Sequence, residues 1–162
     1  MKFLNNHQKR TGISFGLTSA VVTTLGLMVG VNSSTHSFVA VIGGVISIAL
    51  ADAFSDALGI HVSEEAQGVH SQKEVWEATF FTLISKLSVG LTFVIPLLLF
   101  ELTTAVWISV GWGLLLLSIY SYLISMNEEI SAFRAVFEHV ALALAVVFLT
   151  NYIGTYVGTV FV

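Results

Sequence analysis

Two carboxylates, Asp52 and Asp56, lie inside an apolar stretch rich in small residues, residues 48–60. On a helix they are one turn apart and share a face. A charged side chain at membrane depth is costly, so it usually serves a function or has a partner. Carboxylate oxygens suit Mn²⁺, Mg²⁺, Ca²⁺ or Fe²⁺ better than soft metals, and two carboxylates held close can exchange a proton for a metal. We interpret the pair as a candidate metal site.

Lys86 offers a competing explanation for the same carboxylates. Counted from the cytoplasmic ends of their segments, Lys86 lies ~16 Å deep and Asp52 ~13 Å deep at ~1.5 Å per residue. An ion pair between these two residues would account for both charges without transport. A lysine counter-ion that releases a carboxylate to a metal or proton would equally serve coupling. No partner for Asp56 is evident in the sequence, so Asp56 is the stronger candidate ligand.

A segment rich in acidic residues and histidine follows, and its candidate ligands are His61, Glu64, Glu65, His70, Glu74 and Glu77. If the segment is helical, His61 lies one turn from Glu65 and His70 one turn from Glu74, while Glu77 follows Glu74 at a spacing of three. We expect the first three to extend the metal site, and the last three to capture metal at the cytoplasmic surface. The alternative is a solvated loop with ordinary acidic residues.

The composition places these residues in a membrane protein. The 162 residues are 56% hydrophobic and only 10% charged, with no cysteine, whereas soluble domains average about 25% charged residues. Because the sequence has no cysteine, disulfides and thiolate metal sites are excluded. The sequence contains no phosphate-binding glycine loop, zinc-protease helix motif or nucleophile elbow. We expect neither an enzyme nor a nucleic-acid-binding protein.

Five segments are long and apolar enough to cross a bilayer, which takes ~20 residues each. They predict an all-α, five-span membrane protein forming one domain over residues 1–162, with spans at about 12–31, 37–60, 76–99, 103–125 and 135–160. The basic residues outside these spans all fall on one side: Lys2, Lys9, Arg10, Lys73 and Arg134. Basic loops stay in the cytoplasm, so we expect a cytoplasmic N-terminus and an external C-terminus. The expected location is the plasma membrane of a prokaryote.

Small residues recur at four-residue spacing on the first two spans. The rows are Gly12, Gly16, Ala20 and Thr24; Gly26 and Gly30; and Ser47, Ala51, Ser55 and Gly59. Such rows let helices approach closely in lipid. They could pack one bundle internally or form a homodimer. We favour a homodimer, because five helices are few to enclose a pathway and two copies would supply four carboxylates.

Four segments resemble the vacuolar iron transporter family. The first helix, FGLTSAVVTTLGLMVGV at 15–31, is similar to that family's opening F-G-L-x-D-G-L-V-T-T-L-G-L-V-A-G-V. Weaker similarities follow in order at AFSDALG (53–59), VIPLLL (94–99) and LTNYIG (149–154). The resemblance implies a five-helix subunit with its N-terminus inside, which dimerises around the first helices. It also implies export of divalent iron or manganese from the cytoplasm in exchange for protons.

The sequence departs from this family at the residues that would bind metal. The family's first-helix aspartate falls at Ser19 and the next glycine at Ala20. Its second-helix methionine falls at Asp56, and its glutamate two turns earlier at Ile48. The family's cytoplasmic metal-binding helices are replaced by only about residues 61–75. These departures suggest a relocated site with harder ligands.

These observations favour a transporter of a divalent metal cation, Fe²⁺ or Mn²⁺, that exports it from the cytoplasm with proton coupling. The metal would be the substrate, and no permanently bound cofactor is expected. Two alternatives stay open: a membrane sensor or assembly subunit that no longer transports, and a carrier of another small cation. The first is supported by the loss of the family's aspartate and methionine.

Overall fold

The computed structural model describes residues 7–126 and 131–161, which are helical apart from short connections. The helices are α1 (His7–Thr35), α2 (Phe38–Gln67), α3 (Gln72–Thr92), α4 (Val94–Leu99), α5 (Leu102–Ser125) and α6 (Ala132–Phe161). Counting α3 and α4 as one span, five helices are long and apolar enough to cross a membrane. Within the described ranges no strand occurs. The prediction of an all-α, five-span membrane protein is confirmed.

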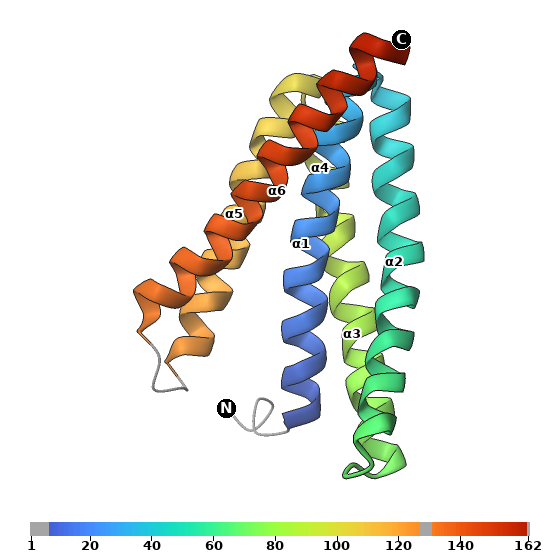
Figure 1. The fold of residues 1–162 in the computed structure, drawn as a ribbon, viewed down its shortest axis with the longest axis vertical. Coiled ribbons are helices and arrows are strands. Elements are labelled where there is room, and N and C mark those ends of the chain that lie inside the picture. Colours follow the sequence, from blue (N-terminus) through green and yellow to red (C-terminus); the bar gives the residue numbers. More distant parts are fainter. Residues whose placement is uncertain (1–6, 127–130, 162) are drawn as a thin grey trace.

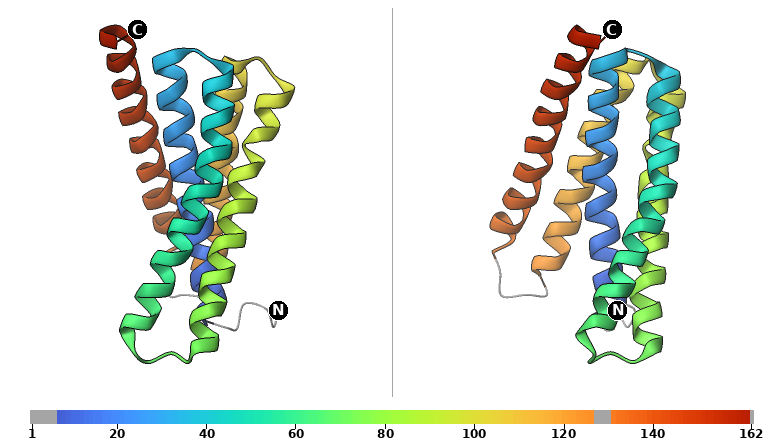
Figure 2. Two further views of the ribbon diagram at one scale, coloured as in Figure 1. Left: turned by 90° about the vertical axis from the view of Figure 1, so that its right-hand side faces the viewer. Right: turned by 45° about the vertical axis from the view of Figure 1, so that its right-hand side comes forward.

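The helices run beyond the apolar stretches from which they were predicted. The second helix continues to Gln67, where Gly68 ends it with a left-handed φ of 67°, a conformation that glycine adopts without steric cost. The next helix starts with a capping box, in which Ser71 and Glu74 satisfy each other's backbone N–H groups. As a result, α2 and α3 project past the other helices at one end of the bundle (Figure 2).

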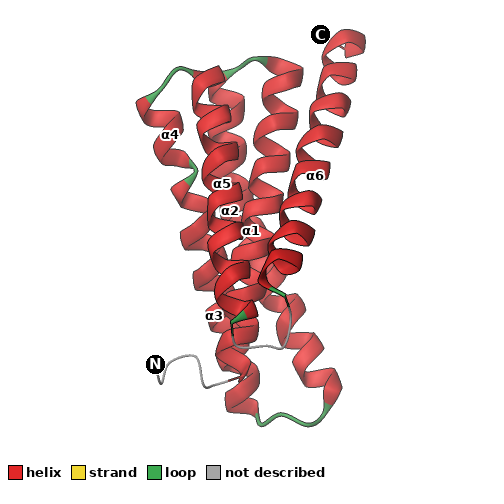
Figure 3. Ribbon diagram, turned by 90° about the vertical axis from the view of Figure 1, so that its left-hand side faces the viewer, coloured by secondary structure: helices red, strands yellow, loops and turns green. Residues whose placement is uncertain are grey.

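The third span is interrupted close to Pro96, a residue type that predicts a kink inside a helix. The break falls at Phe93, between α3 and α4 (Figure 3). Pro96 lies three residues later, in the first turn of α4. Its ring clashes with the carbonyl of the residue four positions earlier, and it has no N–H to donate. That residue is Thr92, the last residue of α3.

Helix α1 occupies the centre of the bundle and contacts α2, α3, α5 and α6. Its glycines allow these close approaches. A Cβ atom at Gly16 would lie 2.7 Å from the Thr82 backbone oxygen, and one at Gly26 would lie 3.0 Å from Val146 Cγ1. The glycine rows of the first helix are thus used for packing within the subunit. Homodimerisation stays a prediction.

The bundle is more tightly closed at one end than at the other. The first residues of α1 and the last of α6 lie at opposite ends, and the α5–α6 pair diverges from α1 toward the end where α1 begins (Figure 1). We call these the N-terminal end and the C-terminal end of the bundle. Between the helices lies an apolar core that includes Val21, Leu25, Met28, Val41, Val45, Leu97 and Val147.

Candidate functional site

Lys86 of α3 lies at the centre of a buried cluster of charges. Its side chain is only 2% exposed, and its Nζ lies 2.6 Å from Oδ2 of Asp52. The same Nζ contacts Oδ2 of Asp56. Both carboxylates belong to successive turns of α2, so the helical spacing directs them at one ammonium group. We call Lys86, Asp52 and Asp56 the charge triad.

Ser19 of α1 completes the cluster. The Lys86 ammonium donates a hydrogen bond to Ser19 Oγ at 2.8 Å, and Ser19 Oγ donates in turn to Asp56 Oδ2 at 2.7 Å. The hydroxyl therefore links a cation and an anion from two other helices. Asp52 is held differently. Its Oδ2 is buried and accepts no hydrogen bond of good geometry from the described residues, so its contact with Lys86 is an ion pair.

Small residues on α2 let the helices approach closely enough for these contacts. Ala49, Ala53 and Ala57 are buried and form a four-residue row beside the two carboxylates. Gly90 of α3 faces Ala49, and a Cβ atom at Gly90 would lie 3.2 Å from the Ala49 Cβ. With larger side chains at these positions, α3 could not bring an ammonium group so near α2.

The triad carries one unbalanced negative charge when all three groups are ionised. Removing charges from water is costly, and the cost is offset only by close pairing and hydrogen bonds. Lys86 has three partners and is fully enclosed, whereas the side chains of Asp52 and Asp56 are 25% and 19% exposed. The arrangement can therefore accept one more positive charge, or exchange the ammonium for another cation.

The triad settles two interpretations made from the sequence. The Lys86–Asp52 ion pair is confirmed. The interpretation that Asp56 lacks a partner is wrong, since Asp56 contacts both Lys86 and Ser19. Ser19 was not predicted as a site residue. A lone serine in an apolar helix does not by itself indicate a functional site. The only indication in the sequence was that Ser19 stands where the vacuolar iron transporter family has its first-helix aspartate.

The first part of the acidic segment is helical, as the spacing required. His61 Nε2 lies 3.7 Å from Glu65 Oε1, and His61 Nδ1 lies 2.9 Å from Thr79 Oγ1. The imidazole also packs on the Trp76 ring, with centroids 4.7 Å apart. These contacts join the end of α2 to α3. His61 is thus held in place by packing and hydrogen bonding, beside one candidate carboxylate.

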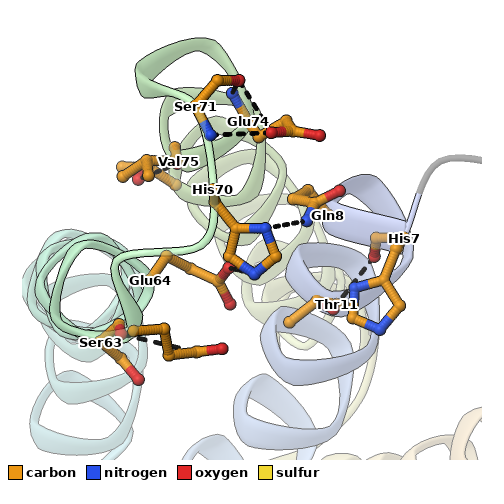
Figure 4. Close-up of polar contacts among 11 residues, drawn as sticks. His7, Gln8, Thr11, Ser63, Glu64, His70, Ser71, Glu74 and Val75 are labelled. Carbon is orange, nitrogen blue, oxygen red and sulfur yellow. Dashed lines mark hydrogen bonds and ion pairs between the residues drawn. The ribbon is translucent and has the colours of Figure 1, made fainter.

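The rest of the segment is arranged differently from a helix. His70 lies in the connection between α2 and α3, so its predicted one-turn spacing from Glu74 does not arise. It instead approaches Glu64 at 3.3 Å through Nε2, while Nδ1 lies 2.9 Å from the Gln8 amide of α1 (Figure 4). The Glu64 side chain is only 8% exposed. This His70–Glu64–Gln8 cluster ties the α2–α3 connection to α1.

The remaining candidate ligands have separate partners. Glu74 bonds the Ser71 backbone N–H and hydroxyl, both at 2.8 Å, and Glu77 lies 4.0 Å from Lys9. Over residues 7–126 and 131–161, no three His, Asp or Glu side chains come close enough together to hold a metal ion. The metal role of these residues stays a prediction.

Comparison of the chain with family models, curated proteins and solved structures gives no match. The fold class and the geometry of the triad therefore stand on the residues of this chain alone. The resemblance to vacuolar iron transporters stays a prediction.

Proposed function

We propose that the protein is a proton-coupled carrier that exports a small cation, with Mn²⁺ or Fe²⁺ as its substrate. The observation that carries the proposal is the convergence of two carboxylates on one enclosed ammonium inside a five-span bundle. Intramembrane charges that pair with one another commonly mark ion pathways and proton relays. In this proposal the N-terminal end faces the cytoplasm of a prokaryotic cell, and the protein is a homodimer.

Charge balance suggests how the triad would couple the two ions. Low-dielectric surroundings favour states without net charge. One neutral state has a protonated carboxyl, a carboxylate and the lysine ammonium. The other has a divalent cation, two carboxylates and a neutral lysine amine. Converting the first into the second binds one metal ion and releases two protons, so the exchange moves no net charge. Lys86 acts as the internal cation that the substrate displaces.

Flux measurements in proteoliposomes test this proposal. Purified protein is reconstituted into liposomes that contain a metal-sensitive dye. The interior of the liposomes is made more acidic than the medium, and uptake of Mn²⁺ or Fe²⁺ in exchange for protons is followed by the dye. We expect Asp52→Asn and Asp56→Asn to lower the flux by at least about tenfold, since each removes a charge that the substrate needs. Glu138→Gln is the matched control, because Glu138 is exposed and pairs with Arg134. Wild-type protein with no divalent flux would refute the proposal.

A second function, a non-transporting membrane subunit, is favoured by a specific observation. Each ionised group of the triad already has a partner, and among the described residues no group of three metal ligands forms. In that case the triad would only fix α2 against α3 and α1. Wild-type flux separates the two functions, because a purely structural triad leaves vesicles as impermeable to divalent ions as protein-free liposomes.

A further inference from the structure

A cavity of about 330 Å³ lies between α1 and the α5–α6 pair, next to the charge triad. This is many times the volume needed to admit one water molecule. Its lining includes Thr18, Ser19 and Thr23 of α1, Leu117 of α5, and His139 and Leu142 of α6. Ser19 lines this cavity, and its Oγ bonds both Lys86 and Asp56, so Ser19 belongs to the cavity and to the polar cluster of the triad.

A second cavity, of about 410 Å³, continues the first toward the N-terminal end of the bundle. The two share Phe15, Thr18 and His139 in their linings. The second also includes His7 and Arg10, in the first turn of α1. From His7 to Ser19 the path follows α1 for ~18 Å at ~1.5 Å per residue. We call the joined cavities the α1–α6 groove.

The wall of the groove carries polar groups among mostly apolar side chains. Thr18 and Thr23 donate their hydroxyl protons to the backbone oxygens of Ser14 and Ser19, which leaves oxygen lone pairs for other donors. His139 Nδ1 lies 2.7 Å from Ser121 Oγ, and Ser14 Oγ lies 2.6 Å from the Tyr120 hydroxyl. Polar groups at this spacing can hold bridging waters in a cavity of this size.

The groove ends about one turn of α1 beyond Ser19, at Thr23, and does not continue to the C-terminal end. Beyond Ser19 the interior is filled by Val21, Leu25 and Met28, all fully buried. There α6 closes on α1, because Gly26 and Gly30 face Val146 and Thr150, whereas the helices diverge at the N-terminal end (Figure 1). A dry, close-packed core is a barrier to water and ions.

We propose that the α1–α6 groove is a hydrated proton route that connects the N-terminal end of the bundle to the charge triad. Its occupants are water and protons, since the lining of the two cavities, over the described residues, includes no carboxylate to hold a divalent cation. Among the residues that the structure describes, the ionisable groups around the route are His7 and Arg10 of α1, Tyr120 of α5 and His139 of α6. Glu138, next to His139, is exposed and pairs with Arg134. The inference rests on the proposed coupling, while its hydration can be tested separately.

Cysteine labelling tests the route directly, because the natural chain contains no cysteine. Thr18→Cys and Leu142→Cys place a thiol on each wall of the groove. Phe54→Cys is the control on the outer surface of α2, where Phe54 is 62% exposed, at the level of Asp56 and hence of Ser19. Ala20→Cys is the buried control, since Ala20 is 1% exposed. A charged, membrane-impermeant methanethiosulfonate is applied to inverted and to right-side-out vesicles.

Only a thiol in contact with water ionises and reacts with this reagent. We expect both groove variants to react at least about tenfold faster than either control, and only from the side of the N-terminal end. Groove cysteines that react no faster than Phe54→Cys would overturn the inference, because the groove would then hold lipid.

The function of the route is tested on the same labelled protein. Attaching a cationic group at Thr18→Cys should lower proton-coupled Mn²⁺ flux by at least about tenfold, because a fixed charge repels protons in the groove. Unchanged flux after complete labelling would overturn the proton route. Fast labelling together with no wild-type flux would refute the carrier function and leave only the hydration of the groove established.

Discussion

Replacing Lys86 with methionine should destabilise the bundle more than any other single loss of charge. The methionine keeps most of the apolar stem, but two carboxylates then face each other with only the Ser19 hydroxyl as a donor. Removing one partner from a buried ion pair costs about 3–5 kcal/mol. Because the carboxylates are 25% and 19% exposed, we expect the lower end, about 3 kcal/mol. For a protein of this size, each 1 kcal/mol of lost stability lowers Tm by about 2–4 °C, so the loss should lower Tm by about 6–12 °C.

The measurement is thermal unfolding of the purified protein in detergent micelles at neutral pH. Lys73→Met is the matched control, because Lys73 is exposed at the start of α3, and its Tm should stay within about 2 °C of wild type. Adding Asp52→Asn and Asp56→Asn to Lys86→Met should restore most of the lost stability, because no unpaired charge then remains buried. A Lys86→Met protein as stable as Lys73→Met would refute the description of Lys86 as the enclosed counter-ion of both carboxylates.

Four further substitutions test contacts within the bundle. Ser19→Ala removes the hydrogen bond that the hydroxyl accepts from Lys86 and the one that it donates to Asp56. It should cost about 1.5–3 kcal/mol in the same unfolding assay; a smaller loss would mean that water replaces the hydroxyl. Gly16→Ala forces a Cβ atom to 2.7 Å from a backbone oxygen of α3 and should cost about 1–3 kcal/mol. The control is Gly111→Ala in α5, where an added Cβ atom meets nothing within 4 Å. It should gain up to about 1 kcal/mol in helix propensity, so equal effects of the two glycine substitutions would contradict the assigned packing. His70→Ala leaves the buried carboxylate of Glu64 without its imidazole partner and should cost about 1–3 kcal/mol in the same assay; an unchanged Tm would show that Glu64 is solvated.

The sequence was sufficient for features that depend on local pattern. Apolar length predicts the five spans, and Pro96 predicts the interruption between α3 and α4. Comparing depths along two helices also predicts that Lys86 meets Asp52. Where α2 ends could not be predicted from hydropathy, because its last turns leave the apolar stretch and are held by polar contacts such as that of His61 with Thr79.

Contacts between residues far apart in the chain could not be predicted from the sequence, because they depend on how the helices are rotated and packed. Whether Lys86 also reaches Asp56 depends on the rotation of α2 about its axis, which is set by packing against α1 and α3. Ser19 joins the cluster only because α1 presents that turn to α2 and α3 together. In the same way, a glycine row predicts that some helix packs closely there, but only the assembled bundle shows that α3 is the partner of Gly16.

If the protein is a homodimer, its interface should not be formed by the glycines of α1, because these glycines pack against α3 and α6 of the same subunit. The small-residue row of α2, which includes Ala51 and Gly59, is exposed, and Asp52 follows Ala51 directly. Two carboxylates that are partly exposed beside this row would be costly in lipid, and a second copy packed on α2 would cover them. We therefore expect Ala51→Cys to form an intersubunit disulfide in native membranes, since small residues let Cα atoms come within about 4.4–6.8 Å. Phe15→Cys, on the exposed face of α1, is the competing position. Cross-linking of Phe15→Cys without cross-linking of Ala51→Cys would place the interface on α1. If neither variant cross-links, a dimer through α1 or α2 is refuted.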